Sequence, residues 1–175
     1  KQKTAYEITY GDWSSDVCSS DLMRLRAPLP GWTAKADVVV IGSGVAGLTT
    51  ALQIRAHNLS VLLVTKSFID AGSTKWAQGG IAAALGPGDS PDQHEKDTLV
   101  AGAGLCDLPA VKVLVSEGPE AVRKLIARGA VFDKSETGEI ALTREGGHLR
   151  NRILHAGGDA TGAEVSRALL AAVSN

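Results

Sequence analysis

Cysteine and aromatic residues are scarce in this chain of 175 residues, which contains two cysteines and 4% aromatic residues. The two cysteines, Cys18 and Cys106, are too few for a disulfide framework or a zinc site. No apolar run reaches roughly 18 residues, the length that a membrane-spanning helix needs. We therefore expect no metal and no membrane partner, and the default compartment is the cytoplasm.

An excess of charge of either sign is also lacking. The chain has 18 Lys and Arg residues against 19 Asp and Glu residues, a formal net charge of −1, and no polybasic block. This balance gives no support for a nucleic-acid partner. The hydrophobic fraction of 44% is typical of a globular domain with a core of its own.

Residues 1–22 differ in composition from the rest of the chain. They contain both tyrosines and one of the two cysteines, and their apolar residues follow no helical or strand period. We expect this segment to be an artefactual or disordered arm that takes no part in the fold, with Met23 as a candidate start. Residues 23–175 are then expected to form the N-terminal part of a nucleotide-binding domain.

The chain is organised around a short apolar run followed by three glycines. Val38 to Ile41 has the pattern of a parallel strand that is buried on both faces. Gly42, Gly44 and Gly47 follow at the spacing of the dinucleotide fingerprint. In that motif the glycines allow a tight turn, the approach of a pyrophosphate and close packing of the next helix on the strand. Free amides at the start of that helix favour a phosphate.

A second apolar run, residues 60–64, completes a βαβ unit of about 30 residues. This run ends without the Asp or Glu that binds ribose in many dinucleotide sites about 20 residues after the glycines. Lys66 stands there instead. It could neutralise a phosphate or an electron-rich ring, or it could be a solvated loop lysine, and both alternatives remain open.

Two further segments suggest binding. Residues 73–84 are dominated by small side chains, which lets backbone lie against a flat ring or a phosphate. The alternative is a strand of small residues packed in a core. Residues 142–148 gather ionisable and glycine residues in a loop, where binding groups are often displayed. The alternative is a solvated turn with a salt bridge.

Capping signals predict the remaining elements. Ser90 precedes Pro91 and a helical pattern, and Asp107 precedes another, as N-cap residues do. Thr161 and Glu164 have the spacing of a capping box. We expect helices over residues 92–101, 108–118, 119–128 and 162–173, and short strands over 131–133 and 153–154.

Four segments in sequence order resemble the L-aspartate oxidases, which belong to the flavoprotein family of succinate dehydrogenase and fumarate reductase. They are residues 42–48, 73–83, 143–148 and 152–156. The resemblance implies an α/β fold: a Rossmann-like FAD-binding domain with a parallel sheet, incomplete in this chain. The family's capping domain, its C-terminal helical domain and its catalytic acid and base would lie beyond residue 175.

The resemblance implies an enzyme that oxidises L-aspartate to iminoaspartate, with oxygen or fumarate as electron acceptor. This reaction is the first step of de novo NAD biosynthesis, and quinolinate synthase is the implied partner. The residues then expected to bind FAD are Gly42, Ser43, Gly44, Val45, Ala46, Gly47, Lys66, Ser73, Thr74, Lys75, Trp76, Ala77, Gln78, Gly79 and Gly80.

Two positions separate this sequence from the dicarboxylate enzymes of the family. Succinate dehydrogenase flavoproteins have a histidine, bonded covalently to the flavin, where Ser73 stands here. Serine cannot form that bond, so we expect non-covalent FAD. Glu145 replaces an aromatic residue and is expected to recognise the substrate amine. Leu149 departs from the family pattern, which often has a serine there.

Three alternatives remain. The chain could belong to a fumarate reductase or succinate dehydrogenase flavoprotein, which Ser73 and Glu145 disfavour. It could belong to an NAD(P)-dependent dehydrogenase, which the missing ribose carboxylate disfavours. It could also be a non-catalytic nucleotide-binding fragment.

Overall fold

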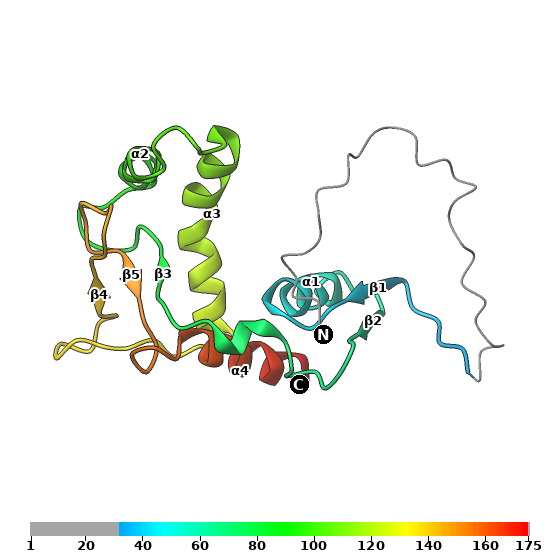
Figure 1. The fold of residues 1–175 in the computed structure, drawn as a ribbon. Coiled ribbons are helices and arrows are strands. Elements are labelled where there is room, and N and C mark those ends of the chain that lie inside the picture. The colour runs from blue at the N-terminus through cyan, green and yellow to red at the C-terminus, as the bar shows by residue number, and fades with distance from the viewer. Residues whose placement is uncertain (1–31, 175) are drawn as a thin grey trace, which may run out of the picture. The chain divides into compact units, whose positions relative to one another are not determined.

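A computed structural model describes residues 32–174 of the chain. The expectations for residues 1–22 and for Met23 lie outside these described residues. The elements, shown in Figure 1, are β1 (Val38–Ile41), α1 (Val45–Arg55), β2 (Val61–Val64), η3 (Ser73–Trp76), β3 (Ile81–Ala82), α2 (Pro91–Ala101), α3 (Leu108–Ala127), β4 (Leu142–Thr143), β5 (Ile153–Leu154) and α4 (Thr161–Ser174).

The predicted βαβ unit is present. Strands β1 and β2 pair in parallel, with Val38 opposite Val61 and Ile41 opposite Val64. The connecting helix α1 contacts both strands and buries Leu48 and Ala51. The α/β fold with a parallel sheet is thus confirmed.

One face of β1 is open, so the prediction of a strand buried on both faces is wrong for the described residues. Val40 is buried beneath α1, whereas Val39 is 54% exposed and Ile41 is 85% exposed. The reason is that the parallel sheet has only two strands within residues 32–174. Side chains on successive residues of a strand point to opposite faces, and α1 covers one of them.

A second, antiparallel sheet has the strand order β3-β5-β4. The central strand β5 pairs through Leu154 with Ile81 on one side and with Leu142 on the other. Helices α3 and α4 contribute Val122 and Ala168 to the core on which this sheet packs. A smaller cluster of Leu48, Val165 and Leu169 joins α1 to α4, so the two sheets share one continuous packed structure.

Helix α3 runs without a break from Leu108 to Ala127, where the sequence predicted two helices separated at Pro119. Proline usually interrupts a helix because it lacks an N–H group and its ring crowds the preceding turn. Here Pro119 is buried on the same helical face as Val115 and Val122. Burial of that face offsets the missing hydrogen bond. The predicted stop at Gly129 is confirmed: this residue has φ +92° and its N–H donates to the carbonyl of Ile126.

The capping predictions have mixed outcomes. Ser90 and Asp107 cap α2 and α3, accepting hydrogen bonds from the amides of Gln93 and Ala110. The prediction that Thr161 and Glu164 form a capping box is wrong. The Thr161 hydroxyl accepts from the Ala156 amide, and Glu164 accepts from the Val131 amide and pairs with Arg167. The partners of these two side chains lie outside α4, apart from Arg167.

Residues 131–133 do not form the predicted strand. The amide of Asp133 donates to the carbonyl of His155, and the Asp133 carboxylate accepts from the amides of Gly157 and Gly158. These contacts tie the segment to the end of β5 without a regular ladder.

Within residues 32–174, no helix combines the length and the apolar character needed to cross a membrane.

Candidate functional site

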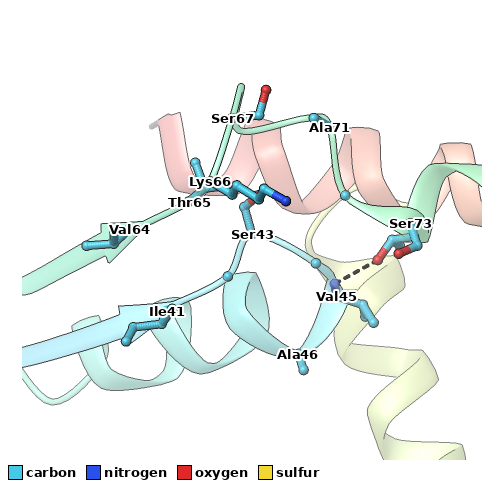
Figure 2. A pocket seen from close by; sticks show the side chains of 14 residues that line it. Ile41, Ser43, Val45, Ala46, Val64, Thr65, Lys66, Ser67, Ala71 and Ser73 are labelled. Carbon is cyan, nitrogen blue, oxygen red and sulfur yellow. Dashed lines mark hydrogen bonds between the residues drawn. The ribbon is translucent and has the colours of Figure 1, made fainter. Parts of the chain in front are cut away.

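A pocket of about 700 Å³ opens at the carboxyl ends of β1 and β2. Figure 2 shows its three walls: the turn after β1, the segment after β2, and the segment leading into η3. Ligands of open α/β sheets bind at this end of the strands. The lining residues are Ile41, Gly42, Ser43, Gly44, Val45, Ala46, Val64, Thr65, Lys66, Ser67, Ala71, Gly72, Ser73 and Thr74.

The glycine turn has the local geometry that the fingerprint requires. Gly42 has φ +105°, a conformation that favours glycine, and its amide donates to the carbonyl of Val64 at 2.8 Å. A side chain at Gly47 would overlap the carbonyl oxygen of Gly42. The first glycine therefore forms the turn, and the third lets α1 pack directly on it. The Ser43 hydroxyl donates to that of Thr65 at 3.1 Å, joining the ends of the two strands.

The start of α1 presents only part of its amides to the pocket. The Val45 amide donates to the Thr74 hydroxyl at 2.9 Å, drawn as a dashed line in Figure 2. Among the described residues, the amides of Ala46 and Gly47 have no protein acceptor. Helix N-termini attract anions through such amides and the helix dipole.

The charge of the pocket also suits a phosphate. Lys66 brings a cationic side chain to the lining, and no lining residue carries a carboxylate. The glycine turn, the Ala46 amide without a protein acceptor and one cation together fit a diphosphate group. The residues present therefore fit FAD at its phosphates.

The pocket brings together Gly42, Ser43, Gly44, Val45, Ala46, Lys66, Ser73 and Thr74 of the residues predicted to bind a cofactor. Gly47 does not line the pocket; it packs against the carbonyl of Gly42. The remaining predicted residues, Lys75, Trp76, Ala77, Gln78, Gly79 and Gly80, do not line it. Their contact with a cofactor stays a prediction.

Residues 75–80 have structural contacts of their own. Lys75 lies 3.5 Å from Asp70 and 5.3 Å from the ring centroid of Trp76, which is 73% exposed. A side chain at Gly80 would overlap Ile153 of β5. Gly80 is thus required for strand packing, which was the alternative reading of the small-residue string.

Six lining residues were not predicted from the sequence: Ile41, Val64, Thr65, Ser67, Ala71 and Gly72. The available signal was the small pair Ala71-Gly72 just before the string of small residues at 73–84. A Cβ on Gly72 would lie 3.5 Å from the Cα of Gly44, so the two segments approach closely.

Glu145 lies in the loop between β4 and β5, with its side chain 55% exposed. Its Oε1 atom is 3.3 Å from Nε2 of His155, whose side chain is 21% exposed. The loop cluster predicted from residues 142–148 thus contains a close contact between Glu145 and His155, and about half of the Glu145 side chain remains exposed to a ligand.

A buried charge cluster lies beneath this loop. Arg152 is fully buried and contacts Asp89 and Asp97 at 2.7 and 2.9 Å. Asp97 also accepts a hydrogen bond from the Leu149 amide, and this bond, together with Arg152, holds the pKa of Asp97 below its ordinary 3.8 although burial acts in the opposite direction. The cluster fixes α2 to the loop that carries Glu145.

His94 completes the cluster. It is buried on α2, its ring centroid lies 5.4 Å from that of His148, and its Nδ1 atom is the one buried side-chain polar atom without a partner in the described residues. Burial and the charge of Arg152 lower the pKa of His94 below 6.5. In the folded state its ring therefore stays neutral to a lower pH than the ring of a solvent-exposed histidine.

Comparison with known proteins gives a match to the FAD binding domain family over residues 37–175. The chain is 68% identical over 151 residues to the L-aspartate oxidase of Streptomyces coelicolor. It also resembles the solved structures of Mycobacterium smegmatis Sdh1 in complex with UQ1 (TM-score 0.73, 38% identity) and of E. coli quinol fumarate reductase FrdA (TM-score 0.71, 28% identity).

These matches cover most of this chain and a minor part of each relative. The Streptomyces coelicolor alignment spans 86% of this chain and 26% of the relative. The alignments with Sdh1 and FrdA each span 79% of this chain, and 23% and 24% of those chains. The chain thus spans about a quarter of the length of the relatives it matches.

Proposed function

This chain belongs to the FAD binding domain family, and on that premise we propose that it is part of an enzyme that oxidises L-aspartate to iminoaspartate. The observation that carries the proposal is the 68% identity over 151 residues with an L-aspartate oxidase. The reaction removes two electrons and two protons from the Cα–N bond of aspartate. Oxygen or fumarate is the final acceptor.

FAD supplies the two-electron acceptor for this reaction, and the chain's own residues bind and orient it. We assign its phosphates to the turn after β1, where the Ala46 amide lacks a protein acceptor and Lys66 provides positive charge. Ser73 and Thr74 form the wall where the chain enters η3. The Thr74 hydroxyl also fixes the start of α1 by accepting from Val45.

Glu145 is assigned the recognition of the substrate ammonium group. Aspartate differs from succinate by this group, and Glu145 offers an exposed carboxylate on a loop tied down by the buried Arg152 cluster. A charge-assisted hydrogen bond contributes about 1.5–3 kcal/mol, which corresponds to roughly 10- to 150-fold discrimination.

The alternative function is that of a succinate dehydrogenase or fumarate reductase flavoprotein. The likeness to Sdh1 at 38% identity supports it. The two functions differ in substrate. Succinate has no ammonium group, so it offers no cationic partner to the Glu145 carboxylate.

Anaerobic reduction of the full-length flavoprotein tests the proposal. L-aspartate and succinate are added separately, and bleaching of the flavin absorbance is followed. Bleaching by L-aspartate supports the proposed function, and bleaching by succinate alone refutes it in favour of the alternative.

The role of Glu145 is tested in the same assay. We expect E145Q to lower the preference for aspartate over succinate by roughly 10- to 150-fold. E136Q, a change at an exposed loop residue, serves as the matched control and should leave the preference unchanged. An E145Q enzyme with the wild-type preference would remove Glu145 from substrate recognition.

We further infer a cytoplasmic enzyme whose unstable imine product is consumed by quinolinate synthase, in the first step of de novo NAD biosynthesis. Co-purification of the two full-length enzymes, and faster quinolinate formation in their mixture than the free imine permits, would support this partnership.

A further inference from the structure

His155 lies where the loop of Glu145 meets the residues that follow the η3 segment. Its Nε2 atom is 3.3 Å from Oε1 of Glu145. The same atom would lie 2.9 Å from a Cβ placed on Gly80, so the imidazole lies directly against that glycine. His155 thus touches both the residue assigned to the substrate amine and the end of the string predicted to line the cofactor.

The position of His155 is fixed by its surroundings. It follows the fully buried Leu154 in the central strand of the antiparallel sheet. Its carbonyl accepts a hydrogen bond of 2.8 Å from the Asp133 amide. Its side chain is 21% exposed, whereas that of Glu145 is 55% exposed. The histidine is therefore the more firmly held member of the pair, and the glutamate is the more exposed one.

We propose that His155 is a positioning residue that orients the Glu145 carboxylate for the substrate ammonium group. This inference rests on the proposed function, because it assigns to Glu145 a partner in aspartate recognition. Contact with one carboxylate oxygen leaves the second oxygen for the ligand.

The physical effect is preorganisation. A long, exposed glutamate side chain samples several rotamers, and binding a ligand requires it to adopt one of them. A contact made before the ligand arrives reduces that ordering penalty. The ordering of one such side chain corresponds to about 2- to 12-fold in affinity.

A purely structural role for His155 makes a different prediction. If the ring only fills the space beside Gly80, its loss should lower stability or weaken all ligands alike. If the ring acts through Glu145, its loss should weaken aspartate and spare succinate, and only while Glu145 is present.

The test uses the full-length holoenzyme. The dissociation constant of L-aspartate is read from the concentration dependence of the anaerobic flavin-reduction rate, and that of succinate from its competition with L-aspartate in the same assay. The variants are H155L, H155Q, E145Q and the double variant H155L/E145Q. The exposed His57, which lies outside the site, provides the matched control as H57L. Melting temperatures of all variants report on folding.

We expect H155L to lower the aspartate preference by about 2- to 12-fold. H155Q, which keeps an N–H group near the position of Nε2, should retain most of that preference, and H57L all of it. In the E145Q background, H155L should add no further loss, because residues that act through one another are not additive.

The outcomes separate the two proposals. If the wild-type enzyme does not prefer aspartate, or E145Q keeps the preference, the proposed recognition by Glu145 fails and this inference with it. If E145Q loses the preference but H155L keeps it, or H155L lowers it equally in both backgrounds, only the role of His155 is overturned.

Discussion

The guanidinium of Arg152 binds both carboxylate oxygens of Asp89, with Nη2 2.7 Å from Oδ1 and Nε 2.9 Å from Oδ2. The two side chains are 0% and 1% exposed. They are 63 residues apart in the sequence, one just before α2 and the other just before β5. This bidentate pair therefore joins two distant segments through a buried ionic contact.

Replacement of Asp89 by asparagine should destabilise the protein strongly. Removing one partner of a buried ion pair costs about 3–5 kcal/mol, since the other charge stays buried. We expect D89N to fall toward the lower end of that range, because Asp97 still contacts Arg152 at 2.9 Å. The urea midpoint of the full-length protein measures the change.

The exposed pair of Glu120 and Arg123 provides the control for this prediction. Glu120 Oε2 lies 3.6 Å from Arg123 Nη1, and the two side chains are 59% and 60% exposed. Because water screens such a pair, E120Q should change stability by less than about 1 kcal/mol. Equal midpoint shifts for D89N and E120Q would contradict the view that burial makes the Arg152 contact important.

Stability should decrease as the pH falls below 6.5 because of His94. Burial and Arg152 lower the pKa of this histidine in the folded state, whereas the unfolded chain titrates near the ordinary value of 6.5. Below that value the unfolded state binds more protons than the folded state, so stability is full above pH 6.5 and is lost as the pH falls toward the folded pKa.

Melting temperatures between pH 7.5 and 5 measure this dependence. H94Q removes the titrating group, and its melting temperature should vary less with pH over this interval. H57Q, at an exposed histidine, should retain the wild-type dependence. A wild-type slope in H94Q would show that another group controls acid stability.

FAD should dissociate from the denatured full-length protein. Ser73 is exposed at the start of η3 and lines the pocket, and a serine side chain has no nitrogen that could carry a flavin bond. Acid precipitation followed by centrifugation should leave the yellow flavin in the supernatant. Flavin that remains with the pellet after washing would refute non-covalent binding.

The sequence predicted the elements whose signals are local. The turn at Gly42, the caps at Ser90 and Asp107, and the stop at Gly129 each depend on a few neighbouring residues, and each is present. The break at Pro119 is absent because tertiary burial of one face of α3 outweighs the local preference.

Long-range relationships could not be read from spacing alone. Arg152 and His155 lie in residues 152–156, one of the segments that resemble the flavoprotein family. Nothing in the neighbouring sequence indicates that Arg152 contacts Asp89 or that His155 contacts Glu145. The open face of β1 likewise depends on how many strands the sheet contains, which the pattern of Val38 to Ile41 does not encode.

Gly47 should be the least replaceable glycine of the turn after β1. A Cβ at this position would overlap the carbonyl oxygen of Gly42 and lie 2.9 Å from its carbonyl carbon, so the backbone itself would have to move. We therefore expect G47A to separate α1 from β1 and to lower the FAD content of the purified full-length protein.

The ratio of flavin to protein absorbance measures the effect, and G118A in α3 is the matched control. Apart from its chain neighbours and the backbone of its own helix, no heavy atom lies within 4 Å of a Cβ built on Gly118. The advantage of alanine over glycine within a helix, about 0.5–1 kcal/mol, is opposed here by crowding between that Cβ and the ring of Pro119. G118A should keep its FAD, and its stability should change little. If G47A also keeps wild-type FAD content and melting temperature, close packing of α1 on the turn is not what the third glycine provides, and its role would have to lie in contact with the cofactor itself.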